Sequence, residues 1–304
     1  MNQDIVLRCE NVTRSFGETK VLTDINLEIV RGQSVGFVGS SGCGKSTLFN
    51  MILGSLNPSS GRIQIATTNG VMREVDGHGS DRGMVFQKYA IFPHLTAVQN
   101  VAFGPMVHET TIPERQIGRI TGSWPTLRKE HLEKAEELLC ELGLKDALHK
   151  YPRQLSGGMC QRVAVARALI MEPEVLLLDE PFGALDEESR DDARQTLKKL
   201  YKKCTLAMVT HSLEEAVSVG DRVIGFSKWW DWKKYGHTEF PGATIVYDKA
   251  APVFTHEDEA SAGRIMLQAD ELRQVVFTGR NLDPKTHCQF WNKVAAGEVE
   301  GVLK

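Results

Sequence analysis

The chain has 304 residues, which is enough for one large domain with an appendage or for two domains. Hydrophobic residues make up 41% and charged residues 25%, as in ordinary globular proteins, and the net charge of −3 gives no electrostatic reason to expect binding to nucleic acid. No apolar run approaches the roughly 18 residues that span a bilayer, and the N-terminus lacks the pattern of a signal peptide. Six cysteines without C-x-x-C spacing favour a reducing cytoplasm.

The first third of the chain is rich in predicted strands. Alternating apolar residues predict half-buried strands over 24–29 and 62–65, and a short apolar run predicts another over 34–38. The polar, glycine-bearing stretch 66–81 is expected to be a loop.

The stretch GSSGCGKST, at 39–47, lies between the strand predicted over 34–38 and a helix predicted over 48–53. Its glycines allow successive backbone N–H groups to point inward, and the helix N-terminus adds partial positive charge, so the stretch is typical of a phosphate-binding loop. We expect Lys45 to reach the β- and γ-phosphates of a nucleotide and the Ser46 hydroxyl to bind Mg²⁺. The residues predicted to surround the nucleotide here are Gly39, Ser40, Ser41, Gly42, Cys43, Gly44, Lys45, Ser46 and Thr47.

The middle of the chain contains a second candidate anion site. After a loop predicted over 105–125 and a helix predicted over 126–142, the sequence LSGGM places Ser156 as the N-cap of a further helix. The N-terminus formed by Ser156, Gly157 and Gly158 is suited to an anion. Since one γ-phosphate needs a single such element within a chain, two distant ones suggest a dimer in which each chain completes the site of the other.

A third motif follows the apolar run 175–178, which is typical of a central parallel strand. Asp179 at the end of this strand is suited to hold the water shell of Mg²⁺. Glu180 follows directly, where its carboxylate is placed to orient and deprotonate an attacking water. Beyond Glu180, the sequence predicts a helix over 189–203 and strands over 205–209 and 222–226.

In their order, these motifs resemble those of ABC-type ATPases, the ATP-binding cassettes of transporters, over about residues 4–227. Residues 39–46 resemble Walker A, 175–179 resemble Walker B, and 155–159 resemble the signature motif. The resemblance implies four further site residues. They are Phe16, which stacks on adenine; Gln87, which contacts Mg²⁺ or water and relays nucleotide state; Asp186, which acts across the dimer interface; and His211, which contacts the γ-phosphate.

The resemblance also implies the architecture. We expect an α/β fold, the P-loop ABC ATPase cassette, with a RecA-like core sheet, an antiparallel β subdomain and an inserted helical subdomain at about 88–158. The cassette is expected over 1–228 and a C-terminal extension over 229–304. The tryptophans at the start of the extension either close the core of the cassette or belong to a regulatory or partner-docking element.

The function implied by the resemblance is ATP hydrolysis that drives a multi-subunit importer of a small polar solute. The expected partners are a second copy in a head-to-tail ATP sandwich, separate transmembrane permease subunits and, indirectly, a solute-binding protein; nucleic acid is not expected. The location implied is peripheral, on the cytoplasmic face of the membrane. Met159 and the stretch 81–87 resemble the nitrate, sulfonate and taurine importer branch.

The alternative is a soluble ABC ATPase that is not coupled to transport, of the iron–sulfur assembly type. Repair ATPases of this class have a long coiled coil before the signature, and no sustained heptads occur here. Translation cassettes come in tandem, whereas this chain contains one. A GTPase is disfavoured because no Asp follows the single Asn-Lys pair, Asn292-Lys293, at the guanine-reading spacing.

Overall fold

The computed structural model describes residues 4–67, 69–110, 123–183, 190, 204–252, 259–278 and 283–288. Asp186 and all of the helix predicted over 189–203 except Arg190 lie outside these ranges. Among the described residues, no helix combines the length and the apolar character that a membrane span requires.

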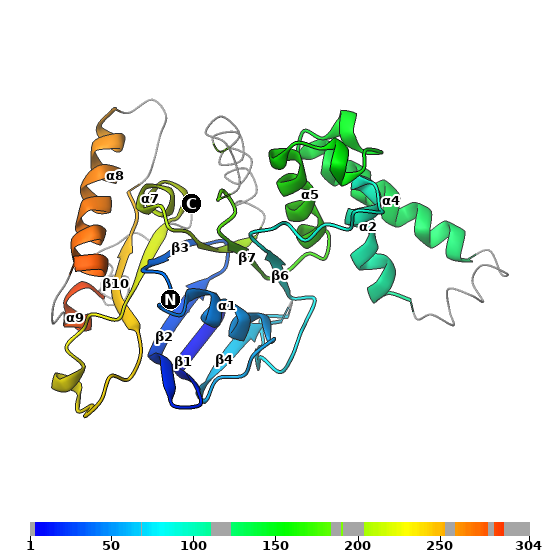
Figure 1. The fold of residues 1–304 in the computed structure, drawn as a ribbon. Helices are drawn as coiled ribbons and strands as arrows, with labels where there is room; N and C mark the ends of the chain where they lie inside the picture. Colours follow the sequence, from blue (N-terminus) through cyan, green and yellow to red (C-terminus); the bar gives the residue numbers. More distant parts are fainter. Residues whose placement is uncertain are drawn as a thin grey trace.

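The main sheet has six strands in the order β10-β9-β3-β8-β7-β6, of which all but β10 run parallel (Figure 1). The strands are β3 (Ser34–Gly39), β6 (Arg82–Val85), β7 (Val175–Asp179), β8 (Thr205–Val209), β9 (Arg222–Ser227) and β10 (Thr244–Ala250). The strands predicted at 34–38, 175–178, 205–209 and 222–226 are confirmed. Central parallel strands are covered on both faces, which explains their unbroken apolar sequences.

A second, antiparallel sheet has the order β2-β1-β4-β5. Its strands are β1 (Ile5–Phe16), β2 (Thr19–Val30), β4 (Ser60–Ala66) and β5 (Met72–Glu74). The stretch 66–81 is therefore not entirely loop, because β5 pairs with the end of β4. Helix α1 (Lys45–Leu53) packs between the two sheets and joins them in one apolar core (Figure 1).

Three longer helices form a separate layer beside β6 (Figure 1). They are α2 (Ala97–His108), α4 (Ser123–Glu141) and α5 (Gly157–Leu169), with the 3₁₀ turns η1 (Lys145–Ala147) and η2 (Pro152–Gln154) between α4 and α5. The helix predicted over 126–142 is confirmed. The loop predicted over 105–125 is wrong at both ends, because α2 continues through Pro105 to His108 and α4 already begins at Ser123. Residues 111–122 lie outside the described ranges.

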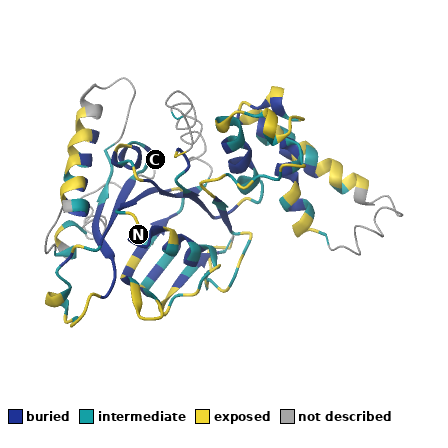
Figure 2. Cartoon of the chain, viewed as in Figure 1, coloured by how far each residue is buried: buried dark blue, intermediate teal, exposed yellow. Residues whose placement is uncertain are grey.

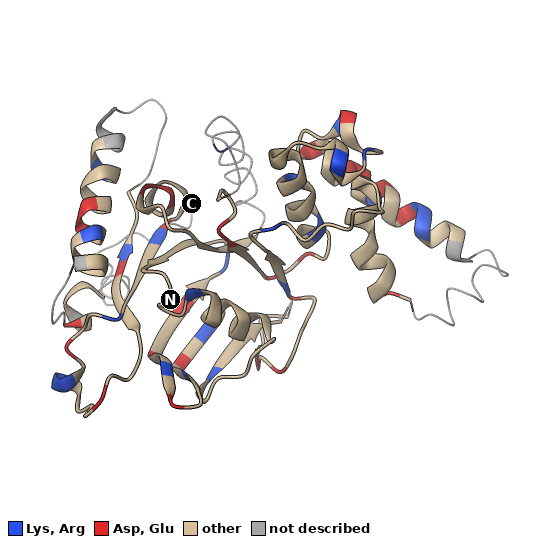
Figure 3. Cartoon of the chain, in the orientation of Figure 1, with Lys and Arg blue, Asp and Glu red and all other residues tan. Residues whose placement is uncertain are grey.

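The surface of α4 is polar. Basic and acidic residues are interspersed along it (Figure 3), and Lys129 lies 3.5 Å from Glu133 one turn away. The opposite side of the helix packs into the core of the helical layer through Ala135 and Leu139, both fully buried.

The segment after residue 228 continues the main sheet. Strand β10 pairs with β9, and the face of this pair is covered by α7 (Leu213–Val219), α8 (Glu259–Leu272) and the π-helical turn η4 (Arg273–Thr278). The remaining elements are the 3₁₀ turn η3 (Trp232–Tyr235) and α9 (Pro284–His287). Helix α8 has a buried inner side and an exposed outer side (Figure 2). The boundary predicted at 228 thus falls inside a sheet, where Trp230 is buried and Trp229 is exposed.

Candidate nucleotide-binding site

The phosphate loop, residues 39–47, joins the carboxyl end of β3 to the N-terminus of α1. Gly44 precedes α1 with φ of 97°, and a Cβ atom there would lie 2.6 Å from Leu22 Cδ2, so both backbone and space require glycine. Lys45 is buried, and its Nζ donates to the carbonyl oxygens of Gly39 at 2.7 Å and Ser40 at 3.3 Å. The ammonium group is therefore held across the loop.

An oxygen pair suited to a metal ion lies beside the loop. Asp179 ends β7, and its carboxylate accepts a hydrogen bond from the Ser46 hydroxyl. Burial and then the charge of Glu180 raise the pKa of Asp179, while the bond from Ser46 and the charge of Lys45 oppose the shift. Hydroxyl and carboxylate oxygens are ligands that Mg²⁺ accepts. In the described ranges no three His, Cys, Asp or Glu side chains form a metal cluster. An ion at the Ser46–Asp179 pair would take its other ligands from phosphate and water.

Glu180 lies between two other residues predicted for the site. Its Oε2 accepts from Gln87 Nε2 at 2.9 Å, and its Oε1 lies 2.6 Å from His211 Nε2. Gln87 follows β6, Glu180 follows β7 and His211 follows β8, so the carboxyl ends of three neighbouring strands supply the cluster. A carboxylate held from both sides is fixed in position for work on a water.

The turn that carries His211 is braced by buried polar contacts. Thr210 donates through its hydroxyl to Glu215 Oε2 at 2.5 Å and accepts from the backbone N–H of Ser212 at 3.1 Å. Ser212 in turn caps α7 by accepting from the Glu215 N–H at 3.2 Å. We did not predict these supports from the sequence, although Ser212 followed three residues later by Glu215 is the spacing of a capping box.

Phe16 lies at the end of β1 and is 48% exposed, so it offers an aromatic surface to a ligand. The Arg14 guanidinium lies over the ring with its Cζ 4.4 Å from the centroid. Strand β2 starts three residues later and carries Leu22, which contacts the phosphate loop at Gly44. Phe16 is thus on the hairpin that adjoins the loop, a position suited to stacking on a nucleotide base.

The signature residues lie apart from this cluster. Ser156 is the N-cap of α5, in the helical layer, and its Oγ accepts from the Met159 N–H at 3.3 Å (Figure 1). Within the described ranges, Ser156, Gly157 and Gly158 make no hydrogen bond to residues 39–47. The structure therefore brings Gln87, Asp179, Glu180 and His211 to the loop but leaves the second candidate anion site elsewhere on the chain; Asp186 lies outside the described ranges.

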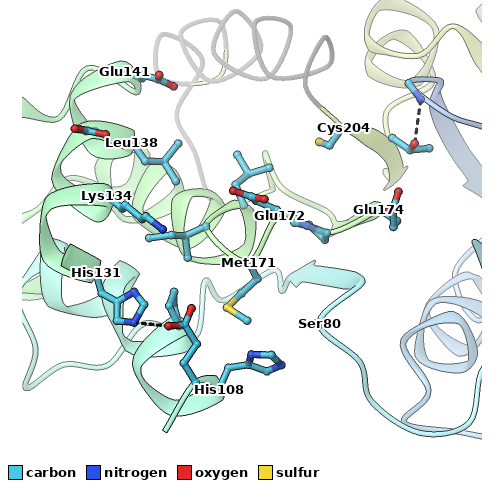
Figure 4. Close-up of a pocket in the computed structure, with 18 of the residues that line it drawn as sticks. Ser80, His108, His131, Lys134, Leu138, Glu141, Met171, Glu172, Glu174 and Cys204 are labelled. Carbon is cyan, nitrogen blue, oxygen red and sulfur yellow. Dashed lines mark hydrogen bonds and ion pairs between the residues drawn. The ribbon is translucent and has the colours of Figure 1, made fainter. Parts of the chain in front are cut away.

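A cleft of about 1000 Å³ lies at the amino ends of the strands of the main sheet. Arg31, Glu174 and Thr205 line it from the amino ends of strands, and α4 contributes His131, whose Nε2 lies 3.1 Å from Glu109 Oε2 (Figure 4). The phosphate loop is at the carboxyl ends of the same strands. This cleft therefore lies at the opposite end of these strands from the phosphate loop.

Known proteins resemble the chain in sequence. The model of the family described as ABC transporter matches residues 22–183. The sulfate/thiosulfate import ATP-binding protein CysA of Gloeobacter violaceus is 41% identical over 81% of this chain and 65% of its own length. The same-named protein of Halalkalibacterium halodurans is 38% identical over 87% of this chain and 71% of its own length. The Fe(3+) ions import ATP-binding protein FbpC of Rhizobium etli is 42% identical over 71% of this chain and 56% of its own length.

The chain spans 56–71% of the length of these three relatives. Solved structures resemble it as well. An ATP-binding cassette in a dimeric, post-hydrolysis state bound to ADP and Pi has a TM-score of 0.59 and 28% identity, over 82% of this chain and 100% of its own. CbiO1 of Clostridium perfringens, part of the complex CbiONQ, has a TM-score of 0.64 and 26% identity, over 89% and 96%. The fold is that of the ABC ATPase cassette, as predicted, and with these sequence matches we conclude that the chain belongs to the ABC transporter family.

Proposed function

We propose that this chain binds ATP with Mg²⁺, hydrolyses it, and so energises an importer built from other chains. One observation carries the proposal: Glu180 follows the Ser46–Asp179 oxygen pair and is held between Gln87 and His211 at 2.9 Å and 2.6 Å. A carboxylate so placed, next to a phosphate loop, is suited to activate water for attack on a phosphoryl group.

Each remaining residue has a role in this proposal. The loop N–H groups and Lys45 bind the β- and γ-phosphates, and Phe16 stacks on the adenine. Ser46, Asp179 and Gln87 hold Mg²⁺, which when bound neutralises charge on the phosphate oxygens. Glu180 accepts the proton of the attacking water, and His211 orients this carboxylate through Nε2 and contacts the γ-phosphate.

The working unit in the proposal is a head-to-tail dimer. Ser156, Gly157 and Gly158 of one copy face the phosphate loop of the other, where the helix N-terminus adds a second set of donors to the γ-phosphate. Asp186 acts across the interface. Two facts support this arrangement: the Ser156 hydroxyl makes no contact with the loop of its own chain in the described ranges, and a solved relative is dimeric.

We infer a role in transport from the relatives, which are import ATP-binding proteins for sulfate/thiosulfate and for Fe(3+) ions. We place the chain at the cytoplasmic face of the membrane, bound to separate permease subunits and served indirectly by a solute-binding protein. A small polar solute is the proposed cargo. The nitrate, sulfonate and taurine branch remains a prediction from the sequence, whereas the relatives named above import sulfate/thiosulfate or Fe(3+) ions.

Co-purification tests the coupling to transport. A tagged chain recovered from detergent-solubilised membranes of its own organism is expected to bring down integral membrane proteins, because an importer needs a spanning subunit that this cassette does not supply in its described ranges. Mass spectrometry identifies the partners, and a tag-only preparation is the control. Recovery with soluble partners alone would instead support an ATPase that is not coupled to transport.

A pair of variants tests the shared site. In Ser156→Arg, a bulky cation blocks the docking of the other copy's phosphate loop, so each monomer should bind ATP while ATP-dependent dimerisation and hydrolysis fail. Lys45→Ala should lose nucleotide binding. Mixing the two inactive proteins should restore up to about a quarter of the wild-type rate, since half of random dimers are mixed and each has one intact site of two.

The readouts are phosphate release and size-exclusion chromatography with ATP. Ser55→Arg, at an exposed serine after α1, is the control for the added arginine and should behave as wild type. Normal hydrolysis by monomeric Ser156→Arg protein would show that one chain holds a complete site.

A further inference from the structure

We propose that Lys228 is a second phosphate-binding cation of the site, which contacts the β- or γ-phosphate beside the loop and so strengthens binding of ATP and ADP over AMP. This inference rests on the proposed function. It concerns a residue in none of the motifs that led to the site.

The position of Lys228 follows from the sheet. It comes directly after β9, whose carboxyl end pairs with that of β3 through Gly39 and Phe226. The phosphate loop begins at the same Gly39. Lys228 therefore lies at the carboxyl ends of the strands, where the phosphates are expected, on the strand next to the one that leads into the loop.

The side chain of Lys228 points at the loop. Its Nζ lies 3.6 Å from the place that a Cβ atom on Gly42 would take. Burial raises the pKa of the thiol of Cys43, the next loop residue, and the charges of Lys45 and, to a smaller extent, Lys228 oppose the shift. Two ammonium groups thus act on the loop, Lys45 from within it and Lys228 from the side of Gly42.

The backbone on both sides of Lys228 is anchored. Ser227 is fully buried; its hydroxyl donates to Val276 O at 3.0 Å and accepts from the Trp229 N–H at 3.0 Å. Trp230 is buried and donates through Nε1 to Gly242 O at 3.0 Å. Because these neighbours are fixed, the backbone that carries Lys228 does not need to be reordered when a ligand binds, and only its side chain has to be immobilised.

Lys228 also differs in its partners from three other lysines of the chain. Lys20, Lys234 and Lys249 each form an ion pair, with Glu239, Asp283 and Glu271. Among the residues that the structure describes, no carboxylate lies within ion-pair distance of Lys228. A half-buried ammonium that faces an anion-binding loop without a protein counter-ion is suited to a phosphate oxygen.

The test is titration of the full chain with Mg²⁺ and either ATP or AMP. Lys228→Gln is expected to raise the Kd for ATP about tenfold, the effect of losing one hydrogen bond to a charged group, and to leave the Kd for AMP unchanged. Lys228→Arg should retain most of the affinity. Lys233→Gln is the matched control, because Lys233 lies over the Trp232 ring in the same segment and should have no effect.

A second measurement needs no variant. Acetylation of wild-type lysines, read by mass spectrometry, should show Lys228 protected by ATP but not by AMP, with Lys233 as the internal reference. An ATP affinity of Lys228→Gln within twofold of wild type, or equal acetylation of Lys228 with and without ATP, overturns the inference alone. A wild-type chain that binds no nucleotide overturns the proposed function and this inference with it.

Discussion

Replacing Glu180 by Gln is expected to lower the rate of ATP hydrolysis by about 10²–10⁴-fold, because the amide keeps the shape of the side chain but cannot accept the proton of the attacking water. Nucleotide binding should persist, since the phosphate loop and Asp179 are untouched. The dimer should then accumulate with ATP, which size-exclusion chromatography can detect. Phosphate release under saturating ATP gives the rate.

Glu172→Gln is the matched control for this substitution. Glu172 has a φ of 50°, close to the 48° of Glu180. It precedes the amino end of β7, whereas Glu180 follows the carboxyl end of that strand. It should leave hydrolysis unchanged. Turnover by Glu180→Gln within threefold of wild type would remove Glu180 from the role of base, and a larger loss in His211→Ala would then transfer the role to His211.

The second large effect concerns stability. Arg222 is fully buried and donates to both carboxylate oxygens of Asp248, through Nε at 2.6 Å and Nη2 at 2.5 Å, and to Glu28 O at 2.6 Å. Asp248→Ala removes the carboxylate that accepts two hydrogen bonds from this buried guanidinium. We expect the free energy of unfolding to fall by about 3–5 kcal/mol, as measured by urea denaturation.

The control is Glu133→Ala on α4, where the pair with Lys129 is exposed and contributes about 0.3–0.5 kcal/mol. The comparison separates a buried ion pair from an exposed one in the same protein. Equal denaturation midpoints for Asp248→Ala and Glu133→Ala would mean that the Arg222 charge finds another partner or water.

The parts of the site that are contiguous in sequence could be predicted from it. A glycine-rich loop needs only its own residues and the strand and helix that flank it, so 39–47 gave the phosphate loop without any tertiary information. Asp179 and Glu180 were similarly placed by the apolar strand before them. The contacts of Gln87 and His211 with Glu180 depend on strand order, which no local pattern encodes, and the family resemblance implied only that both residues belong to the site.

The C-terminal segment shows where sequence patterns fail. Strand β10 has buried residues in succession from Thr244 to Asp248, because β9 and the covering helices enclose it, so it lacks the alternation of a surface strand. Helix α8 follows a polar stretch, and its buried positions, Ile265, Ala269 and Leu272, are spaced for a helix but few. Lys228 could not be found from the sequence, because it lies near Gly42 only when β9 pairs with β3.

Glu180 is held in a left-handed backbone conformation, with φ of 48°, while its N–H donates to Val209 O at 2.9 Å. For a residue with a Cβ atom this conformation costs roughly 1 kcal/mol or more, a cost that glycine does not have. At this position, folding stability therefore favours glycine, whereas the proposed role in hydrolysis requires glutamate. A cassette that did not need to hydrolyse ATP could carry glycine at this position without that conformational cost, because glycine has no Cβ atom to accommodate.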